Sequence, residues 1–323
     1  MRGWRRIIAL AIGMALLLAC AGCGKSGDLR FGTGGTGGNY YVYGNALAQI
    51  LEQENGLSVD VKATAGSAAN LRLLKDDFLQ LAIVQSDTLM DAQKGTGAFQ
   101  GEACTNVSAL AGLYTEACQI IVAADSDIAS VADLYGKRVS VGEQDSGVMR
   151  NAEQILLSAG LNTELIKTEY LSFADAAAAL KAGKLDAFFC TASAPTTAVA
   201  ELARQMDVRI LSLDESAMES MLKMYQNYVS YTIPAGTYEG QGTDVETLGV
   251  KAVLVARNDL SATTAQEILT ALFDHADQLQ YSTGADVMPD LQFATEQIPV
   301  SFHPGAQQYY AAQGIELNGE VAE

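Results

Sequence analysis

A glycine-rich stretch at residues 32–41, GTGGTGGNYY, constrains the fold of this chain more than any other feature. It follows a short strand-like run at 29–31 and precedes an apolar-periodic segment at 43–51, which predicts a strand, a turn and a helix in that order. The glycines leave the backbone N–H groups unshielded and free to take positive φ. Because the following helix adds its own unpaired N–H groups and the positive end of its dipole, an anion can be held here without a basic side chain.

Two functional interpretations compete for this loop. Gly32, Gly34 and Gly37 satisfy the dinucleotide-binding pattern G-x-G-x-x-G, and Asp60 lies near the spacing of a ribose-binding acid. That pattern predicts a nicotinamide-dependent dehydrogenase, but the first strand is short for it and Asp60 alternates within its strand instead of ending it. In the other interpretation, this loop is the first turn that contacts the ligand in an exported binding protein.

The N-terminus favours export. Arg2, Arg5 and Arg6 precede an apolar run at 7–19 that ends in small residues and cysteine, which predicts a lipoprotein signal peptide over residues 1–23. Either Cys23 or Cys20 fits as the lipid-modified cysteine, and the sequence leaves that choice open. A lipid anchor would hold the mature domain at the cell membrane, outside the cytoplasm, while leaving the domain itself soluble.

Charge and motif content exclude several function classes. The chain has 38 acidic and 20 basic residues, so nucleic acid and anionic membrane surfaces are not expected as partners. An anionic ligand must therefore be captured by local groups. No G-x-S-x-G or H-E-x-x-H motif and no credible Cys/His pair is present, so we expect no catalytic residues, no metal and no cofactor. A disulfide between Cys104 and Cys118 stays open.

From residue 29 onward, strand and helix patterns alternate without a long linker. This alternation predicts an α/β fold of two mostly parallel sheets flanked by helices. The middle block resembles a second sheet inserted into the first. The predicted lobe 1 therefore comprises 29–118 and 226–323, the predicted lobe 2 comprises 119–225, and a ligand cleft lies between them. Residues 107–122, which extend across the first boundary between the lobes, read as two apolar runs around Tyr114-Thr115-Glu116.

Three loops, at 34–39, 65–70 and 145–147, repeat one design of strand, Gly/Ser turn and helix start. Each offers backbone N–H groups with a hydroxyl or amide, the usual means of holding a carboxylate or phosphate, although the serines also fit as plain helix caps. In α/β sheets, ligands bind at the carboxyl ends of strands, where these loops lie. The candidate ligand-binding residues are Gly34, Gly35, Thr36, Gly38, Tyr40, Ser67, Asn70, Gln85, Ser146, Gly147, Arg150, Thr191 and Tyr231. Arg150 is the best-placed cation among them.

A series of motifs runs through the mature chain: GTG at 32–34 with Gly37-Gly38-x-Tyr40, TxGSxxNL at 64–71, AIVQ at 82–85, DLxGKxVSVG at 133–142, SG at 146–147, LxxGxxDAFF at 180–189 and HPGAxxYY at 303–310. Together they resemble the TAXI family of TRAP-transporter solute receptors. The resemblance implies a type II periplasmic-binding-protein fold whose lobes close on a small acid such as glutamate or another carboxylate, and delivery of that acid to a separate membrane permease driven by an ion gradient.

Carried over position by position, the resemblance implies a ligand shell made of the glycine loop, Tyr40, Ser67, Asn70, Gln85 and Ser146-Gly147. One departure affects the far wall of the pocket, because Cys190-Thr191-Ala192 follows Phe189 where the family often has a glycine. The sequence thus predicts a monomeric, membrane-anchored receptor for a TRAP permease. A receptor for an ATP-driven importer is the first alternative, and a dehydrogenase the second.

Overall fold

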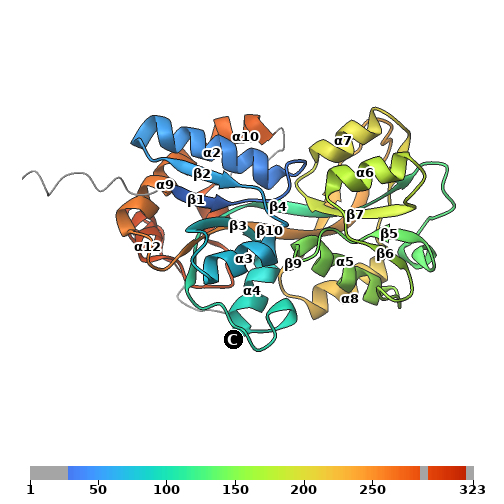
Figure 1. The fold of residues 1–323 in the computed structure, drawn as a ribbon, viewed down its shortest axis with the longest axis horizontal. Helices are drawn as coiled ribbons and strands as arrows, with labels where there is room; N and C mark the ends of the chain where they lie inside the picture. Colours follow the sequence, from blue (N-terminus) through green and yellow to red (C-terminus); the bar gives the residue numbers. More distant parts are fainter. Residues whose placement is uncertain (1–27, 284–289, 318–323) are drawn as a thin grey trace, which may run out of the picture.

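The computed structural model describes residues 28–283 and 290–317, which form two lobes side by side (Figure 1). The predicted signal peptide at 1–23, with the candidate anchor residues Cys20 and Cys23, lies outside the described residues. Within those two ranges, no helix has both the length and the apolar character needed to cross a bilayer.

The two lobes are built from alternating strands and helices. The strands are β1 (Leu29–Gly32), β2 (Val59–Lys62), β3 (Leu81–Gln85), β4 (Val107–Ala123), β5 (Arg138–Ser140), β6 (Lys167–Glu169), β7 (Ala187–Ala192), β8 (Val208–Ile210), β9 (Tyr228–Ile233) and β10 (Val245–Arg257). The α-helices are α2 (Asn39–Asn55), α3 (Ser67–Lys75), α4 (Ser86–Lys94), α5 (Gly147–Ser158), α6 (Phe173–Lys181), α7 (Thr197–Ala203), α8 (Glu215–Met224), α9 (Ala262–Asp274), α10 (Ala276–Thr283), α11 (Leu291–Thr295) and α12 (Pro304–Ala312).

The strands form a sheet in the order β2-β1-β3-β10-β4-β7-β5-β6, and β8 and β9 pair with β4 and β10. The groups β2-β1-β3 and β6-β5-β7 are parallel, whereas β4 and β10 run antiparallel to their neighbours. The predicted bilobed α/β fold is confirmed. It differs from the expectation in one respect, since β4 and β10 join the two parallel groups into a single mixed sheet.

Strand β4 is one continuous strand of 17 residues that contains both apolar runs and the three residues between them. Its middle residues stay on the ladder, with Tyr114, Thr115 and Glu116 paired opposite Ala252, Lys251 and Val250 of β10. Nearly every residue of the strand is buried, because helices cover both faces of the sheet. Its sequence therefore lacks the alternation of polar and apolar residues that marks a strand with one face in water.

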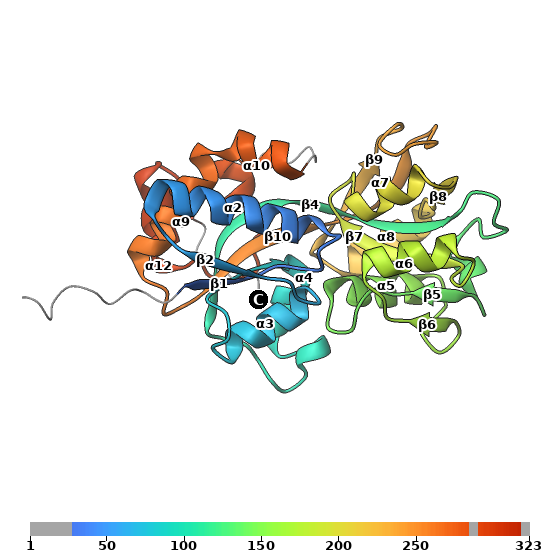
Figure 2. The same cartoon turned by 45° about the horizontal axis from the view of Figure 1, so that its top comes forward.

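Alternate residues of each central strand face different cores, as the two-residue period of a strand requires. In lobe 1, Leu81 and Ile83 pack against α2, α9, α10 and α12 on one face of the sheet, whereas Ala82 and Val84 pack against α3 and α4 on the other face. In lobe 2, α5 and α8 cover one face of the sheet and α6 and α7 cover the other (Figure 2). Residues at or just after the carboxyl ends of β1, β2, β3, β5 and β7 line one cavity between the lobes.

The packing bears on where lobe 2 ends. Tyr228, Leu248 and Val250 lie in the same apolar cluster as Ile120, and Tyr238 lies in the cluster of α6 and α7. We therefore propose that lobe 2 continues to about Val250, beyond the boundary at 225 that the sequence pattern suggests. With this boundary, β9 and the first half of β10 belong to lobe 2.

The cysteines among the described residues form no disulfide bonds. Cys104 lies in the lobe 1 core, Cys118 and Cys190 lie in the lobe 2 cores, and all three are free and buried. The structure therefore contains no Cys104–Cys118 disulfide.

Candidate functional site

A cavity of about 90 Å³ lies between the lobes. It is lined by the glycine loop after β1, by the starts of α2, α3, α5 and α6, by Gln85 at the end of β3, and by residues of β4 and β7. Most of the predicted ligand-binding residues come together here: Gly34, Gly35, Thr36, Gly38, Tyr40, Ser67, Gln85, Ser146, Gly147 and Thr191. Three predicted residues, Asn70, Arg150 and Tyr231, do not line it.

The glycine loop lies beside lobe 2 and adopts no unusual backbone angles. The glycines at 32–38 all lack positive φ, contrary to the expectation from their number. A Cβ on Gly37 would lie 3.6 Å from the Cβ of Ala174, and one on Gly38 would lie 3.6 Å from the ring of Phe173. Both neighbours belong to α6 and would make ordinary van der Waals contact with an added Cβ, so the loop of lobe 1 lies directly against lobe 2.

Four helices begin at the cavity. The first residues of α2, α3 and α5 were expected there, and the start of α6, with Ser172, Phe173 and Ala174, joins them. First-turn N–H groups lack intrahelical partners and carry the positive end of the helix dipole, so four such ends favour an anion. The only sequence signal for the fourth was Ser172 before a helical pattern; its side chain caps α6 by accepting from the N–H of Asp175.

The two serines hold the helix starts in different ways. Ser146 is the N-cap of α5, and its Oγ accepts from the N–H of Met149 at 3.0 Å. Ser67 is not a cap, because Gly66 occupies that position. Its Oγ accepts from the N–H of Gln85 at 3.0 Å and so ties α3 to the end of β3.

Glu116, at the middle of β4, is the residue that sequence reasoning missed. It lines the cavity, is only 2% exposed, and accepts a 2.8 Å hydrogen bond from the hydroxyl of Tyr40. Burial raises the pKa of Glu116 to about 8, against the hydrogen bonds from Tyr40 and Gln85, which lower it. Burial likewise raises the pKa of Tyr40, which keeps its hydroxyl protonated as a donor. One acidic residue within a long, mostly apolar run was the available signal.

Gln85 meets Gly147 across the cavity. A Cβ at Gly147 would lie 1.9 Å from Gln85 Oε1 and 2.9 Å from Ser67 Oγ, so only glycine fits at the start of α5. Other contacts join the lobes nearby: the N–H of Ala69 donates to the carbonyl of Asp145 at 2.9 Å, and Arg72 pairs with Asp145 at 2.6 Å. The lobes are therefore in contact around the cavity, as in a closed arrangement.

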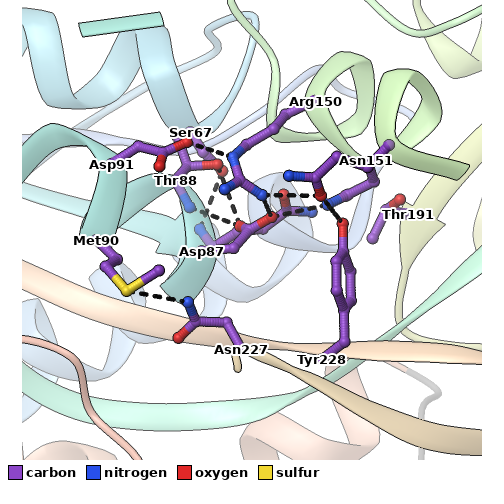
Figure 3. A network of polar contacts seen from close by, with 12 residues as sticks. Ser67, Asp87, Thr88, Met90, Asp91, Arg150, Asn151, Thr191, Asn227 and Tyr228 are labelled. Atoms are coloured by element: carbon purple, nitrogen blue, oxygen red, sulfur yellow. Dashed lines mark hydrogen bonds and ion pairs between the residues drawn. The ribbon is translucent and has the colours of Figure 1, made fainter. Parts of the chain in front are cut away.

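Arg150 is not the ligand-facing cation that its position suggested. Its guanidinium pairs with the carboxylates of Asp87 and Asp91 on α4 and also donates to Gln154 (Figure 3). Asp87 accepts a further 2.8 Å hydrogen bond from Asn151. Two carboxylates thus neutralise this side chain, and it is held outside the cavity lining.

Asn70 and Tyr231 also lie outside the lining. The Asn70 amide is fully buried and donates to the carbonyls of Thr33 and Ile83 at 2.7 and 2.9 Å, so it positions the loop after β1. Tyr231, on β9, packs against the core of α6 and α7. Thr191 does line the cavity, and its hydroxyl donates to the sulfur of Cys118 at 3.8 Å.

Solved structures of low sequence identity share this fold, and two of the three described here are named as binding proteins. A protein from Bordetella bronchiseptica RB50 matches with a TM-score of 0.59 and 14% identity, covering 89% of this chain and 98% of that one. An arginine-bound ancestral arginine-binding protein matches at 0.51 and 16%, covering 79% and 97%. A binding protein component of an ABC phosphonate transporter from Pseudomonas aeruginosa matches at 0.51 and 14%, covering 79% and 77%.

At these identities the structural likeness establishes the fold alone. The sequence itself matches a family model over residues 31–314, which spans both lobes and every cavity-lining residue. By that match, the chain belongs to the NMT1-like family.

Proposed function

We propose that this protein is an extracytoplasmic solute-binding receptor that captures a small carboxylate by closure of its two lobes and passes it, unchanged, to a membrane permease. The observation that carries the proposal is the convergence of four helix N-termini, from both lobes, on one cavity between the lobes. No Lys, Arg or His is found among the described residues that line it, so the N–H groups are the natural partners of an anion.

In the proposed mechanism, the ligand carboxylate binds the glycine loop and the starts of α3 and α5. Closure brings Gly147 of lobe 2 against Gln85 and Ser67 of lobe 1 and removes water from the cavity. Hydrogen bonds strengthen as the surrounding dielectric falls, so the closed state is stabilised when the ligand is present. Its surface is then the form that a permease would recognise.

A thermal-shift screen tests the proposal. The mature protein would be heated with an extrinsic dye in the presence of amino acids, dicarboxylates, 2-oxo acids, sugars, phosphate and nicotinamide dinucleotides. A ligand at a hundredfold excess over its Kd stabilises the folded state by about 2.7 kcal/mol, which raises the melting temperature. A shift with small acids supports the receptor, whereas a shift with dinucleotides alone contradicts it.

The carboxylate site is tested by substitution. We expect Ser67→Ala combined with Ser146→Ala to weaken acid binding at least about tenfold, because it removes from each lobe a hydroxyl group that can donate to the carboxylate. Ser261→Ala is a matched control, since Ser261 caps α9 in the same way but lies outside the cavity. Unchanged affinity in the double variant would place the carboxylate elsewhere.

The sequence motifs favour a TRAP-type permease as the partner, within the TAXI family. One observation favours an ATP-driven importer instead: the matching structure from Pseudomonas aeruginosa is a component of an ABC transporter. Transport assays in vesicles distinguish the two, because uptake that needs an ion gradient and no ATP supports the TRAP assignment. Uptake that requires ATP hydrolysis would replace it. The proposed lipid anchor is tested separately by mass spectrometry of the membrane-bound protein.

A further inference from the structure

The two lobes meet through different contacts on the two sides of the cavity. On one side, Arg150 of α5 pairs with the carboxylates of Asp87 and Asp91 on α4 (Figure 3). Asn151, the next residue of α5, donates to Asp87 at 2.8 Å. These four residues, two from each lobe, form what we call the polar seam.

The polar seam is buried and continues into lobe 2. Asp87 and Asn151 are each 1% exposed, and the Asn151 amide also donates to the hydroxyl of Tyr228 at 2.7 Å. Close by, Asn227 donates to the sulfur of Met90 on α4 at 3.4 Å. Hydrogen bonds to charged groups are the strong ones, and a low dielectric strengthens them further. Separation of the lobes along this seam would break several such contacts together.

On the other side of the cavity, the glycine loop meets the start of α6, and we call this contact the glycine seam. A Cβ on Gly37 would lie 3.6 Å from the Cβ of Ala174, and one on Gly38 would lie 3.6 Å from the ring of Phe173. Within residues 28–283, no hydrogen bond or ion pair joins the loop at 32–38 to α6. Individual van der Waals contacts are weak, so this seam separates at a lower cost.

The cavity also comes closest to solvent at the glycine seam. Among the described residues that line it, only Thr36 of the glycine loop and Ala174 of α6 are exposed. The lining residues next to the polar side, Ser67, Gln85 and Gly147, are buried. The thinnest wall of the cavity therefore lies between the glycine loop and α6.

An open groove adjoins this wall. It has a volume of about 480 Å³ and runs between α6 and α7, which lie side by side on one face of lobe 2 (Figure 2). Gly37 and Ala174 line both the groove and the cavity. A small displacement of the glycine loop from α6 would thus connect the cavity with solvent.

We propose that the lobes open at the glycine seam while the polar seam stays closed, so that the ligand enters and leaves between the glycine loop and α6. Hinged lobes move about the few points that hold them together. Here those points are the crossing strands β4 and β10 and, beside them, the polar seam. The inference rests on the proposed function for the nature of the ligand, but not for the movement.

Distances between spin labels on the two lobes test the movement without any ligand. Asn45→Cys with Ala178→Cys places labels on α2 and α6, and Lys94→Cys with Glu153→Cys places them on α4 and α5. All four positions are exposed and lie outside the cavity lining. For the ligand-free mature protein, we expect the α2–α6 distances to be longer and broader than those in the closed structure. The α4–α5 distances should match that structure.

Substitutions show whether the polar seam holds its side closed. The measurements would use protein with Cys20→Ser and Cys23→Ser, because the cysteines among the described residues are buried and should stay unlabelled. Arg150→Gln should lengthen and broaden the α4–α5 distances, since it removes the cation that joins the lobes. Arg138→Gln is the matched control: Arg138 pairs with Asp186 inside lobe 2, so neither set of distances should change.

A disulfide across the glycine seam tests the entry route. The 3.6 Å between the two Cβ positions suits a disulfide, and Gly37 has no positive φ that would exclude cysteine. Gly37→Cys with Ala174→Cys would be oxidised before L-glutamate, succinate or pyruvate is added. Rapid filtration with radiolabelled acid should show uptake roughly a hundredfold slower than in the same variant after reduction.

The outcomes separate this inference from the proposed function. Lengthening of the α4–α5 distances in the parent protein overturns the inference, with or without a change between α2 and α6. Agreement of both label pairs with the closed structure also overturns it, as does equal uptake by the oxidised and reduced variants. If no small acid binds the wild-type protein, the proposed function fails, while the label distances still decide how the lobes open.

Discussion

The guanidinium of Arg150 donates to Oδ2 of Asp87 at 2.7 Å and thereby joins the first turn of α5 in lobe 2 to the first turn of α4 in lobe 1. Asp87 is 1% exposed and Arg150 17% exposed, so water screens the pair little. Neither residue lines the cavity. The lobes are therefore held together by an ion pair that is separate from the ligand contacts.

This ion pair predicts energetic coupling between the two residues. In a double-mutant cycle of Asp87→Asn and Arg150→Gln, we expect a coupling of about 0.5–3 kcal/mol in the free energy of unfolding, because each single change leaves a buried charge with fewer partners. Urea denaturation measures the four stabilities. Strictly additive effects would show that the pair contributes nothing beyond its separate residues.

Closure predicts a strict requirement for glycine at position 147. Gly147→Ala would place a methyl group 1.9 Å from Gln85 Oε1. We expect this clash to cost the closed state about 1–3 kcal/mol and so to lower ligand affinity at least about tenfold. Each lobe should lose little thermal stability, because the clash arises only where the two lobes meet. The control is Gly242→Ala, where an added Cβ meets no atom within 4 Å. Small-angle scattering at saturating ligand should give a larger radius of gyration for the 147 variant. A compact liganded variant would contradict this mechanism.

Glu116 predicts a pH dependence of stability in the absence of ligand. Its pKa is raised from 4.5 to about 8 on folding, so the folded state binds more protons than the unfolded state between these values. The contribution of Glu116 to stability is therefore full below about pH 4.5 and is lost as the pH rises through 8, by at most about 1.4 kcal/mol per pH unit. The unfolding free energy of wild type minus that of Glu116→Gln should fall between pH 5 and 8. A flat difference would argue against a buried, protonated carboxyl.

The free cysteines predict a labelling pattern. Burial raises the pKa of Cys104, Cys118 and Cys190, so these thiols should resist iodoacetamide in the folded protein and react once it is unfolded. Peptide mapping without reductant measures the label at each site. Failure of Cys104 and Cys118 to react after unfolding, restored by a reducing agent, would reveal the disulfide that the structure lacks.

The sequence predicted the bilobed fold because its strand and helix periods alternate regularly and because turns with Gly and Ser mark the helix starts. It also predicted most of the cavity lining, since glycine loops and N-terminal serines are local signals. Glu116 was missed for a physical reason. A strand buried on both faces has no polar alternation, so a single acid within it reads as an interruption of the strand and not as part of its interior.

Arg150 was predicted to contact the ligand, but it lies outside the cavity lining. Its place on the first turn of α5 was correctly read, but the partners that hold it, Asp87 and Asp91, come from a helix about 60 positions earlier in the chain. Tertiary pairing of this kind leaves no trace in local sequence. The same holds for Asn70, whose buried amide is satisfied by Thr33 and Ile83 and so is not free for a ligand.

Strand β4 has a consequence for how such a receptor can change. Glu116 belongs both to the wall of the cavity and to one of the two strands that pass from lobe 1 into lobe 2. A substitution there alters the chemistry offered to the ligand at a point where the backbone also pairs with Val250 of β10. The wall that meets the ligand and the strand that joins the lobes therefore share one residue.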